Sequence, residues 1–337
     1  MSKALLYLSF GGPNGPDDVF SFMANVTRNR PIPPERLEEV SKHYFLFGGK
    51  SPINEINLEL IDLVGKSLAR RGIKLPIYFG NRNWEPFVGD TIQQMVMDNV
   101  TTGYVFVTSA YGSYSGCRQY LEDLDNANVD AGKLKLIKLR HFYNHPAFIN
   151  SFIENTSKAL HALYQSYTPN EIAILYSAHS IPVSMASVGP YESQLKSVRE
   201  AISRALPIAI PNTIHQAQVF QSRSGSPTQP WLEPDISDEM RRVSNQFGIK
   251  AFIAVPIGFI SDHIEVIYDL DTLARSTAKE IGADFIRIPT PSSNSTFVEL
   301  VADLVQEQID PKFVAPTVSG MPPPVFRCEN NCCIRAV

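Results

Sequence analysis

The residues of this 337-residue chain that are best suited to chemistry come directly after short apolar runs. One run, Glu171–Ser177, is followed by Ala178, His179 and Ser180, so an imidazole stands at the carboxyl end of a predicted strand. Imidazole titrates near neutral pH, and it can therefore accept a proton or bind a metal ion. Position alone leaves a second explanation for His179, which is a ring that only bonds the neighbouring backbone.

Carboxylates follow another apolar run, in the segment GFISDHIEVIYDLD at 258–271. If this segment is helical, Asp262, Glu265 and Asp269 share one face at positions i, i+3 and i+7. With His263 beside them, these oxygen ligands suit a hard or borderline divalent cation in transit. Capping explains part of the pattern equally well, because Asp262 could cap the helix and Glu265 could complete a capping box.

Three of the four cysteines, Cys328, Cys332 and Cys333, lie in the last ten residues, and Cys117 lies far upstream. The short apolar N-terminus lacks the cleavage pattern of a signal peptide, so we expect a reducing, cytoplasmic compartment that favours thiolates or metal ligands over disulfides. Four thiolates can hold a zinc ion or a [2Fe–2S] cluster. The other explanation is a C-terminus with incidental reactive thiols.

The elements that must position these residues are predicted by continuous apolar runs that alternate with amphipathic segments such as Phe148–Gln165 and Tyr191–Ala205. This alternation is typical of parallel sheets covered by helices on both faces. The eight predicted strands are Ala4–Ser9, Leu75–Phe79, Tyr104–Thr108, Leu134–Leu139, Glu171–Ser177, Ile214–Gln221, Lys250–Ile257 and Asp284–Ile288.

The chain is therefore expected to be an α/β protein with two similar doubly wound domains, each with a four-stranded parallel sheet. We place the N-terminal domain at 1–146 and the C-terminal domain, with the His and Glu loops, at 147–310, because proline discourages helix near 146. Residues 311–337 are expected to form a Pro-rich tail that carries the cysteine cluster. Ligands usually bind in the cleft between two such domains.

Composition and missing motifs exclude several classes of protein. The chain has 30 basic and 34 acidic residues, a formal net charge of −4 and 44% hydrophobic residues. These values are those of a folded protein without a general attraction to nucleic acid, and no apolar stretch is long enough to span a membrane. The chain also lacks the GxGxxG and GxxxxGK[ST] motifs, which disfavours dinucleotide binding and nucleotide hydrolysis.

Several segments together resemble ferrochelatases over almost the whole chain: LLYLSFGGP, HYFLFGGKSPIN, YSAHSIP, QSRSG, PWLEPD and VPIGFISDHIEVIYDLD. The resemblance implies two Rossmann-like domains, with a porphyrin in the cleft, and insertion of ferrous iron. The cysteine tail and SYSGCRQY are similar to the actinobacterial branch, which metallates coproporphyrin III to coproheme in haem biosynthesis. Other hypotheses are a protoporphyrin IX ferrochelatase, a cobalt or nickel chelatase, an iron–sulfur electron carrier and a periplasmic-type binding protein.

The resemblance also implies roles for individual residues. His179 and Glu265 match the pair that faces the porphyrin centre and the incoming Fe²⁺, and Asp269 matches a carboxylate that leads inward along the helix. Ser51 and Tyr120 match residues that hold the macrocycle. The propionates of a coproporphyrin would add a need for cationic donors, for which the candidates are Arg28, Arg30 and Arg82.

The family pattern further assigns Cys117, Cys328, Cys332 and Cys333 to a [2Fe–2S] cluster, although their spacing differs from the animal pattern. Phe10 stands where some bacterial relatives carry a tyrosine that ligates the product iron. The expected partners are the porphyrin and Fe²⁺, with transient contact to neighbouring enzymes of the haem pathway and without nucleic acid or a membrane span.

Overall fold

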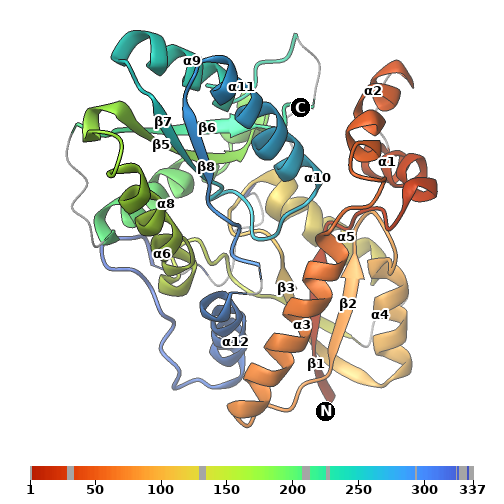
Figure 1. Cartoon of the computed structure of the whole chain (residues 1–337). Helices are drawn as coiled ribbons and strands as arrows, with labels where there is room; N and C mark the ends of the chain where they lie inside the picture. The colour runs from red at the N-terminus through yellow and green to blue at the C-terminus, as the bar shows by residue number, and fades with distance from the viewer. Residues whose placement is uncertain are drawn as a thin grey trace.

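The computed structural model describes residues 2–28, 34–128, 134–206, 213–224, 228–292, 294–323, 325, 332 and 333. It contains two four-stranded sheets, each with helices on both faces (Figure 1). The first sheet has the order β2-β1-β3-β4 and all of its strand pairs are parallel. Its strands are β1 (Ser2–Ser9), β2 (Ile77–Asn81), β3 (Val100–Val107) and β4 (Lys135–Lys138).

The second sheet repeats this arrangement with the order β6-β5-β7-β8, again parallel throughout. Its strands are β5 (Ile172–His179), β6 (His215–Gln221), β7 (Ala251–Val255) and β8 (Asp284–Arg287). All eight strands predicted from the apolar runs are present, and the two doubly wound sheets are confirmed.

The central strands show why the runs are continuous rather than alternating. Along β1, Leu5 and Tyr7 face one core, while Leu6 and Leu8 face another. All four side chains are fully buried, because crossover helices cover both faces of the sheet. The same division occurs in β5, where alternate residues enter separate cores.

Helices connect the strands in both halves. The first half contains α1 (Val19–Thr27), α2 (Pro34–Phe45), α3 (Ile53–Arg70), α4 (Val88–Met97) and α5 (Gln119–Ala127). The second half contains α6 (Pro146–Leu163), α7 (Val183–Ala186), α8 (Tyr191–Ala205), α9 (Ile236–Phe247), α10 (Ile264–Val266), α11 (Arg275–Glu280) and α12 (Ser295–Ile309). Two π-helical segments, η2 (Tyr114–Arg118) and η4 (Ile267–Ala274), and two short 3₁₀ turns, η1 (Pro16–Asp18) and η3 (Pro169–Glu171), complete the structure.

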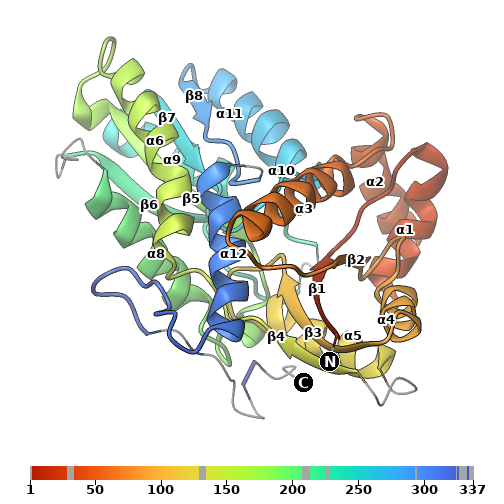
Figure 2. The same ribbon diagram turned by 90° about the horizontal axis from the view of Figure 1, so that it is seen from below.

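Helix α12 joins the two halves. It follows the second sheet in sequence, but it packs against α3 of the first half as well as α6 (Figure 2). Arg71, just after α3, donates to Glu299 and Asp303 of α12 at 2.5 and 2.6 Å. One apolar core runs through both sheets along this helix. The domain boundaries at 146 and 310 stay predictions.

The chain after α12 has no helix or strand in its described part, as the prolines predict. It is fixed by side chains of the segment before α6. Arg140 donates to the carbonyl of Pro316 at 3.0 Å, and Asn144 donates to that of Pro322 at 2.7 Å. Within the described residues, no helix has both the length and the apolar character required to cross a bilayer.

Candidate active site

His179 and Glu265 come together at the carboxyl edge of the second sheet. His179 is the last residue of β5, and Glu265 lies in α10, which follows the neighbouring strand β7. Parallel neighbours end at the same edge of a sheet, where functional groups of this fold class collect. The Nε2 atom of His179 lies 3.7 Å from Oε2 of Glu265. The two side chains are 33% and 41% exposed, so both remain accessible to a ligand.

The orientation of the His179 ring is defined by the backbone of the next residue. Its Nδ1 atom lies 2.5 Å from the carbonyl oxygen of Ser180, which can only accept a hydrogen bond. Nδ1 must therefore carry a proton, and the lone pair of the neutral ring resides on Nε2. The carbonyl of His179 itself accepts a hydrogen bond from the hydroxyl of Tyr191 at 3.0 Å. His179 thus presents a basic nitrogen toward Glu265.

A second imidazole lies beside Glu265. Nδ1 of His263 is 4.0 Å from Oε2 of Glu265. Burial lowers the pKa of His263, and this effect exceeds the opposing attraction of Glu265. His263 is therefore a neutral group at neutral pH. The sequence placed His263 beside these carboxylates in a candidate site for a divalent cation.

Asp269 lies one turn beyond Glu265, in the π-helical segment η4. Burial raises its pKa to about 6, and the negative charge of Glu265 adds to this effect, while a hydrogen bond from the hydroxyl of Ser222 opposes it. Val266, Leu270 and other residues at four-residue intervals anchor the neighbouring face of the helix in the core of the second sheet. Residues four apart lie one above the other on a helix, so Glu265 and Asp269 form a row of carboxylates.

Asp262 does not belong to this row. The helix begins at Ile264 with His263 in the N-cap position and without a side-chain capping bond. Asp262 lies before the helix, where it accepts two hydrogen bonds of 3.0 Å from Arg287 and one of 2.9 Å from Thr290. Both sequence interpretations of Asp262, as a member of the row and as a helix cap, are wrong, because the helix starts at Ile264 and His263 occupies its N-cap position.

Helix α2 of the first half reaches across to this edge. The ring of His43 stacks on that of Tyr268 in η4, with centroids 3.8 Å apart. The next residue, Tyr44, is buried against Ile264, and both burial and the charge of Glu265 raise the pKa of its hydroxyl. The contact of α2 with the carboxylate helix was not predicted, although the quoted segment HYFLFGGKSPIN contains both residues.

Ser51 and Tyr120 are both buried in the first half. Ser51 lies just before α3 and packs closely against Gly12. A Cβ on this glycine would lie 2.7 Å from the serine Cβ. The ring of Tyr120 lies 4.6 Å below the guanidinium of Arg82. The predicted contact of Ser51 and Tyr120 with a macrocycle stays a prediction.

Two of the three candidate arginines lie in the described part of the chain, and they differ in environment. Arg82 is buried and forms an ion pair with Asp123. Arg28 is exposed and donates to the carbonyl of Arg82 at 2.9 Å. Arg30 lies outside the described residues. Phe10, beyond β1, is 37% exposed and has no ligating atom in its side chain.

The tail brings cysteine to the loop that leads to Cys117. Cys117 is buried in η2. Cys333 is buried as well, and a Cβ on either Gly112 or Gly189 would lie 3.6 Å from its sulfur. Cys332 is partly buried, and Cys328 lies outside the described residues. Within the part of the chain that is described, no group of three metal-binding side chains is close enough to hold an ion.

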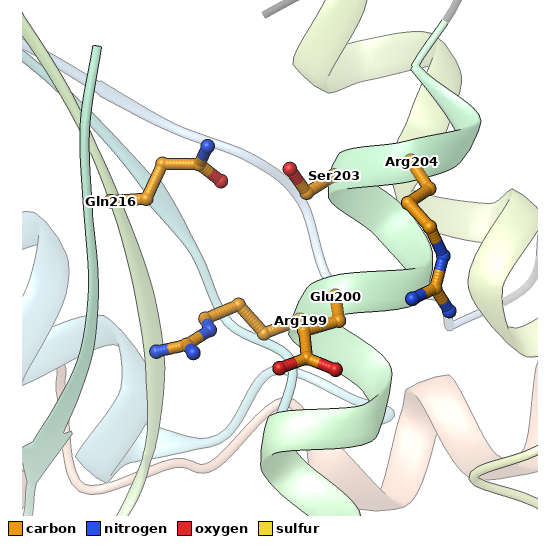
Figure 3. A pocket seen from close by; sticks show the side chains of 5 residues that line it. All are labelled: Arg199, Glu200, Ser203, Arg204 and Gln216. Atoms are coloured by element: carbon orange, nitrogen blue, oxygen red, sulfur yellow. The ribbon is translucent and has the colours of Figure 1, made fainter. Parts of the chain in front are cut away.

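A shallow pocket on the second half is remote from this chemistry. It has a volume of about 260 Å³ and lies between α8 and β6 (Figure 3). Its lining strand residue, Gln216, pairs with Ile174, about 16 Å along β5 from His179 at 3.3 Å per residue. The pocket is lined by Arg199, Glu200, Ser203, Arg204 and Gln216.

Comparisons with known proteins agree with this arrangement. The profile of the family described as Ferrochelatase matches residues 2–309. The chain is 43% identical to the coproporphyrin III ferrochelatase of Nocardia farcinica, covering 98% of this chain and 96% of that protein. It is 44% identical to the enzyme of the same name from Mycolicibacterium smegmatis, covering 91% and 89%.

Among solved structures, the sirohydrochlorin chelatase SirB of Bacillus subtilis subspecies spizizenii, in complex with cobalt, is similar with a TM-score of 0.52. The alignment covers 93% of this chain and 99% of SirB at 8% sequence identity. At this low identity, the likeness concerns the fold alone.

Proposed function

Because the chain belongs to the ferrochelatase family and is therefore a metal chelatase, we propose that it inserts Fe²⁺ into coproporphyrin III to form coproheme. The pairing of His179 Nε2 with Glu265 Oε2 at 3.7 Å carries the proposal. This pair supplies a base and a carboxylate at one accessible point. The names of the relatives at 43 and 44% identity support coproporphyrin as the substrate.

The proposed reaction requires a group that accepts the pyrrole protons. A porphyrin loses two pyrrole protons as Fe²⁺ enters, and an enzyme accelerates this exchange by positioning a base and by excluding water. His179 is the proposed base, because its Nδ1 proton is bound to Ser180 and its Nε2 is left to accept. Glu265 stabilises the imidazolium that forms, as a carboxylate at 3.7 Å does.

Asp269 is the proposed next acceptor. Burial raises its pKa to about 6, so this carboxylate accepts a proton more readily than an ordinary aspartate does. The row from Glu265 to Asp269 then leads protons away from the macrocycle. The oxygen atoms of the same row are suitable ligands for Fe²⁺ on its way to the porphyrin.

The propionates of the substrate are proposed to bind in the first half. Coproporphyrin carries four propionates, and each is a good partner for a cation or a hydroxyl. Arg28 is the better cationic candidate, since Arg82 already neutralises Asp123. Ser51 and Tyr120 are the proposed hydroxyl donors. Removal of the Arg28 charge would weaken substrate binding and leave the chemistry at His179 unchanged.

The test is anaerobic incubation of the purified protein with Fe²⁺ and either coproporphyrin III or protoporphyrin IX, followed by visible absorption. We expect conversion of the coproporphyrin bands to those of coproheme, with slower conversion of protoporphyrin. Metallation of neither porphyrin would refute the proposed activity. Faster metallation of protoporphyrin would refute the proposed substrate and leave the activity in place.

We further propose a [2Fe–2S] cluster bound by Cys117, Cys328, Cys332 and Cys333. The proposal rests on the burial of Cys333 beside Gly112, in the loop that continues to Cys117, and on the preference of such clusters for thiolate ligands. A bound cluster would supply iron–sulfur bonds that fasten the tail to this loop. Protein purified without oxygen should contain about two iron and two sulfide ions per chain, and Cys332→Ser should lose both.

Location in the cytoplasm is proposed on the same chemistry, because cysteine thiolates persist as metal ligands in a reducing compartment. Transient contact with neighbouring enzymes of the haem pathway remains a prediction from the family resemblance.

A further inference from the structure

Two buried tyrosines bond the backbone at the start of the two catalytic loops. The hydroxyl of Tyr191, the first residue of α8, donates to the carbonyl of His179 at 3.0 Å. The hydroxyl of Tyr111, in the loop after β3 of the first half, donates to the carbonyl of Ile257 at 2.8 Å. Ile257 opens the loop that leads to Glu265. Without the two tyrosine hydroxyls, each of these carbonyls would lose a hydrogen-bond donor.

The two tyrosine rings also hold each other. Their centroids lie 5.9 Å apart, and the ring planes meet at 87°, which is the favourable edge-to-face arrangement. Tyr111 additionally contacts the rings of Tyr143 and Phe148 at 6.3 and 6.1 Å. A shift of either hydroxyl would therefore require a change in the packing of several buried rings.

The two loops held by these tyrosines are in direct contact. Gly258 donates to the carbonyl of Ser177 at 3.0 Å, and a Cβ on Gly258 would lie 2.6 Å from the Cα of Ala178. The loop after β7 thus crosses the end of β5 immediately before His179. A small displacement of one carbonyl changes the separation of His179 and Glu265, which the reaction needs at a defined value.

We propose that Tyr111 and Tyr191 are positioning residues for iron insertion, which fix the separation of His179 and Glu265 through the backbone of their loops. The inference rests on the proposed function of that pair. Neither tyrosine touches the reacting atoms in this account. Their hydroxyls affect the rate of the chemical step, and other residues bind the porphyrin.

The test uses Tyr191→Phe and Tyr111→Phe, which keep the packed rings and remove only the hydroxyls. Tyr164→Phe in the same full-length chain is the matched control, because its buried hydroxyl has no hydrogen-bond partner among the described residues. Iron insertion is measured anaerobically, and porphyrin binding is measured separately by fluorescence quenching. Thermal unfolding shows that each variant is folded.

We expect kcat to fall on the order of tenfold in each Phe variant at position 111 or 191, with the porphyrin KM and the binding constant within about twofold of wild type. Tyr164→Phe should retain wild-type kcat. The inference would be overturned if Tyr111→Phe and Tyr191→Phe had the same kcat as the control Tyr164→Phe. It would also be overturned if kcat fell only together with porphyrin binding. A wild-type chain that metallates no porphyrin would instead refute the proposed function itself.

Discussion

The chemistry of His179 depends on which ring nitrogen carries the proton, and the backbone decides this. The carbonyl of Ser180 holds Nδ1, so Nε2 is available beside Glu265. A strand end predicted the position of the imidazole, and the resemblance to ferrochelatases implied that Glu265 would face the same centre. The tautomer was not predictable, because it depends on the path of the backbone after residue 179. Asp262 was misassigned because its partner, Arg287, is distant in sequence.

Replacement of the proposed base should separate chemistry from binding. His179→Ala is expected to lower kcat for iron insertion by about 10²- to 10⁴-fold, which is the usual contribution of a general base, while the porphyrin still binds. Stopped-flow absorption gives kcat and fluorescence quenching gives binding. The control is His161→Ala, since His161 is an exposed residue of α6. A His179→Ala enzyme with more than half of the wild-type kcat would exclude this role.

Asp269 gives a pH-dependent prediction. A carboxyl whose pKa is raised to about 6 by burial binds its proton more tightly in the folded state than in the unfolded state, where its ordinary value is 3.8. Stability is therefore lost as pH rises from about 4 to 6, by no more than about 3 kcal/mol, and the loss persists above pH 6.

Asp269→Asn removes this charge, so it should raise the melting temperature at pH 8 and have a smaller effect at pH 5. Calorimetry at the two pH values checks the difference. Iron insertion should be slower in the variant at both, because an amide cannot accept the proton. A variant that is less stable than wild type at pH 8 would contradict the raised pKa.

At the level of the elements, the position of the strands followed from the sequence, but the winding of the helix that carries Glu265 and Asp269 did not. Buried and polar residues between 264 and 274 recur at four-residue intervals, which is compatible with an ordinary helix in a short window. The structure shows that η4 is π-helical, that its apolar residues pack on the second sheet and that Tyr268 stacks on His43. Such tertiary contacts leave no local pattern.

The loop from β7 to Glu265 crosses the end of β5 so closely that residue 258 has no room for a side chain. Gly258→Ala would place a Cβ 2.6 Å from backbone, so the loop must move and stability should fall by about 1–3 kcal/mol, with a loss of kcat. Urea unfolding and the metallation assay measure the two effects. Gly89→Ala in α4, where a Cβ has open space, should unfold at or above the wild-type urea concentration. If Gly258→Ala and Gly89→Ala unfolded at similar urea concentrations, close packing at residue 258 would be refuted.

For the whole molecule, two domains were predicted from the repeated strand pattern, and two sheets are present. The role of α12 was not foreseen. Its apolar residues predict a helix but not its partner, and in the structure α12 packs on α3 as well as α6. The helices α12 and α3 are joined by a shared apolar core and by ion pairs between distant residues, such as that between Arg71 and Asp303 at 2.6 Å.

The ion pair between Arg140 and Glu307 provides a prediction for the junction of the halves. Both side chains are almost fully buried, with exposed fractions of 0% and 1%. Arg140→Met should leave Glu307 charged and unpaired, at a cost of about 3–5 kcal/mol in unfolding free energy measured by urea. Arg70→Met breaks a pair that is 66% and 42% exposed and should cost less than about 1 kcal/mol. Equal costs would show that the buried pair is unimportant.

Arg140 also determines how experiments on the C-terminal segment must be understood. Its guanidinium donates hydrogen bonds to four groups at once: the carboxylate of Glu307 in α12, the side chain of Asn144, and the carbonyls of His141 and Pro316. Truncation before Pro316 would open this junction to water and loosen α12, whatever the cysteines bind. Replacement of single cysteines therefore tests the chemistry of the thiolates while the chain end stays attached. Truncation changes both at once.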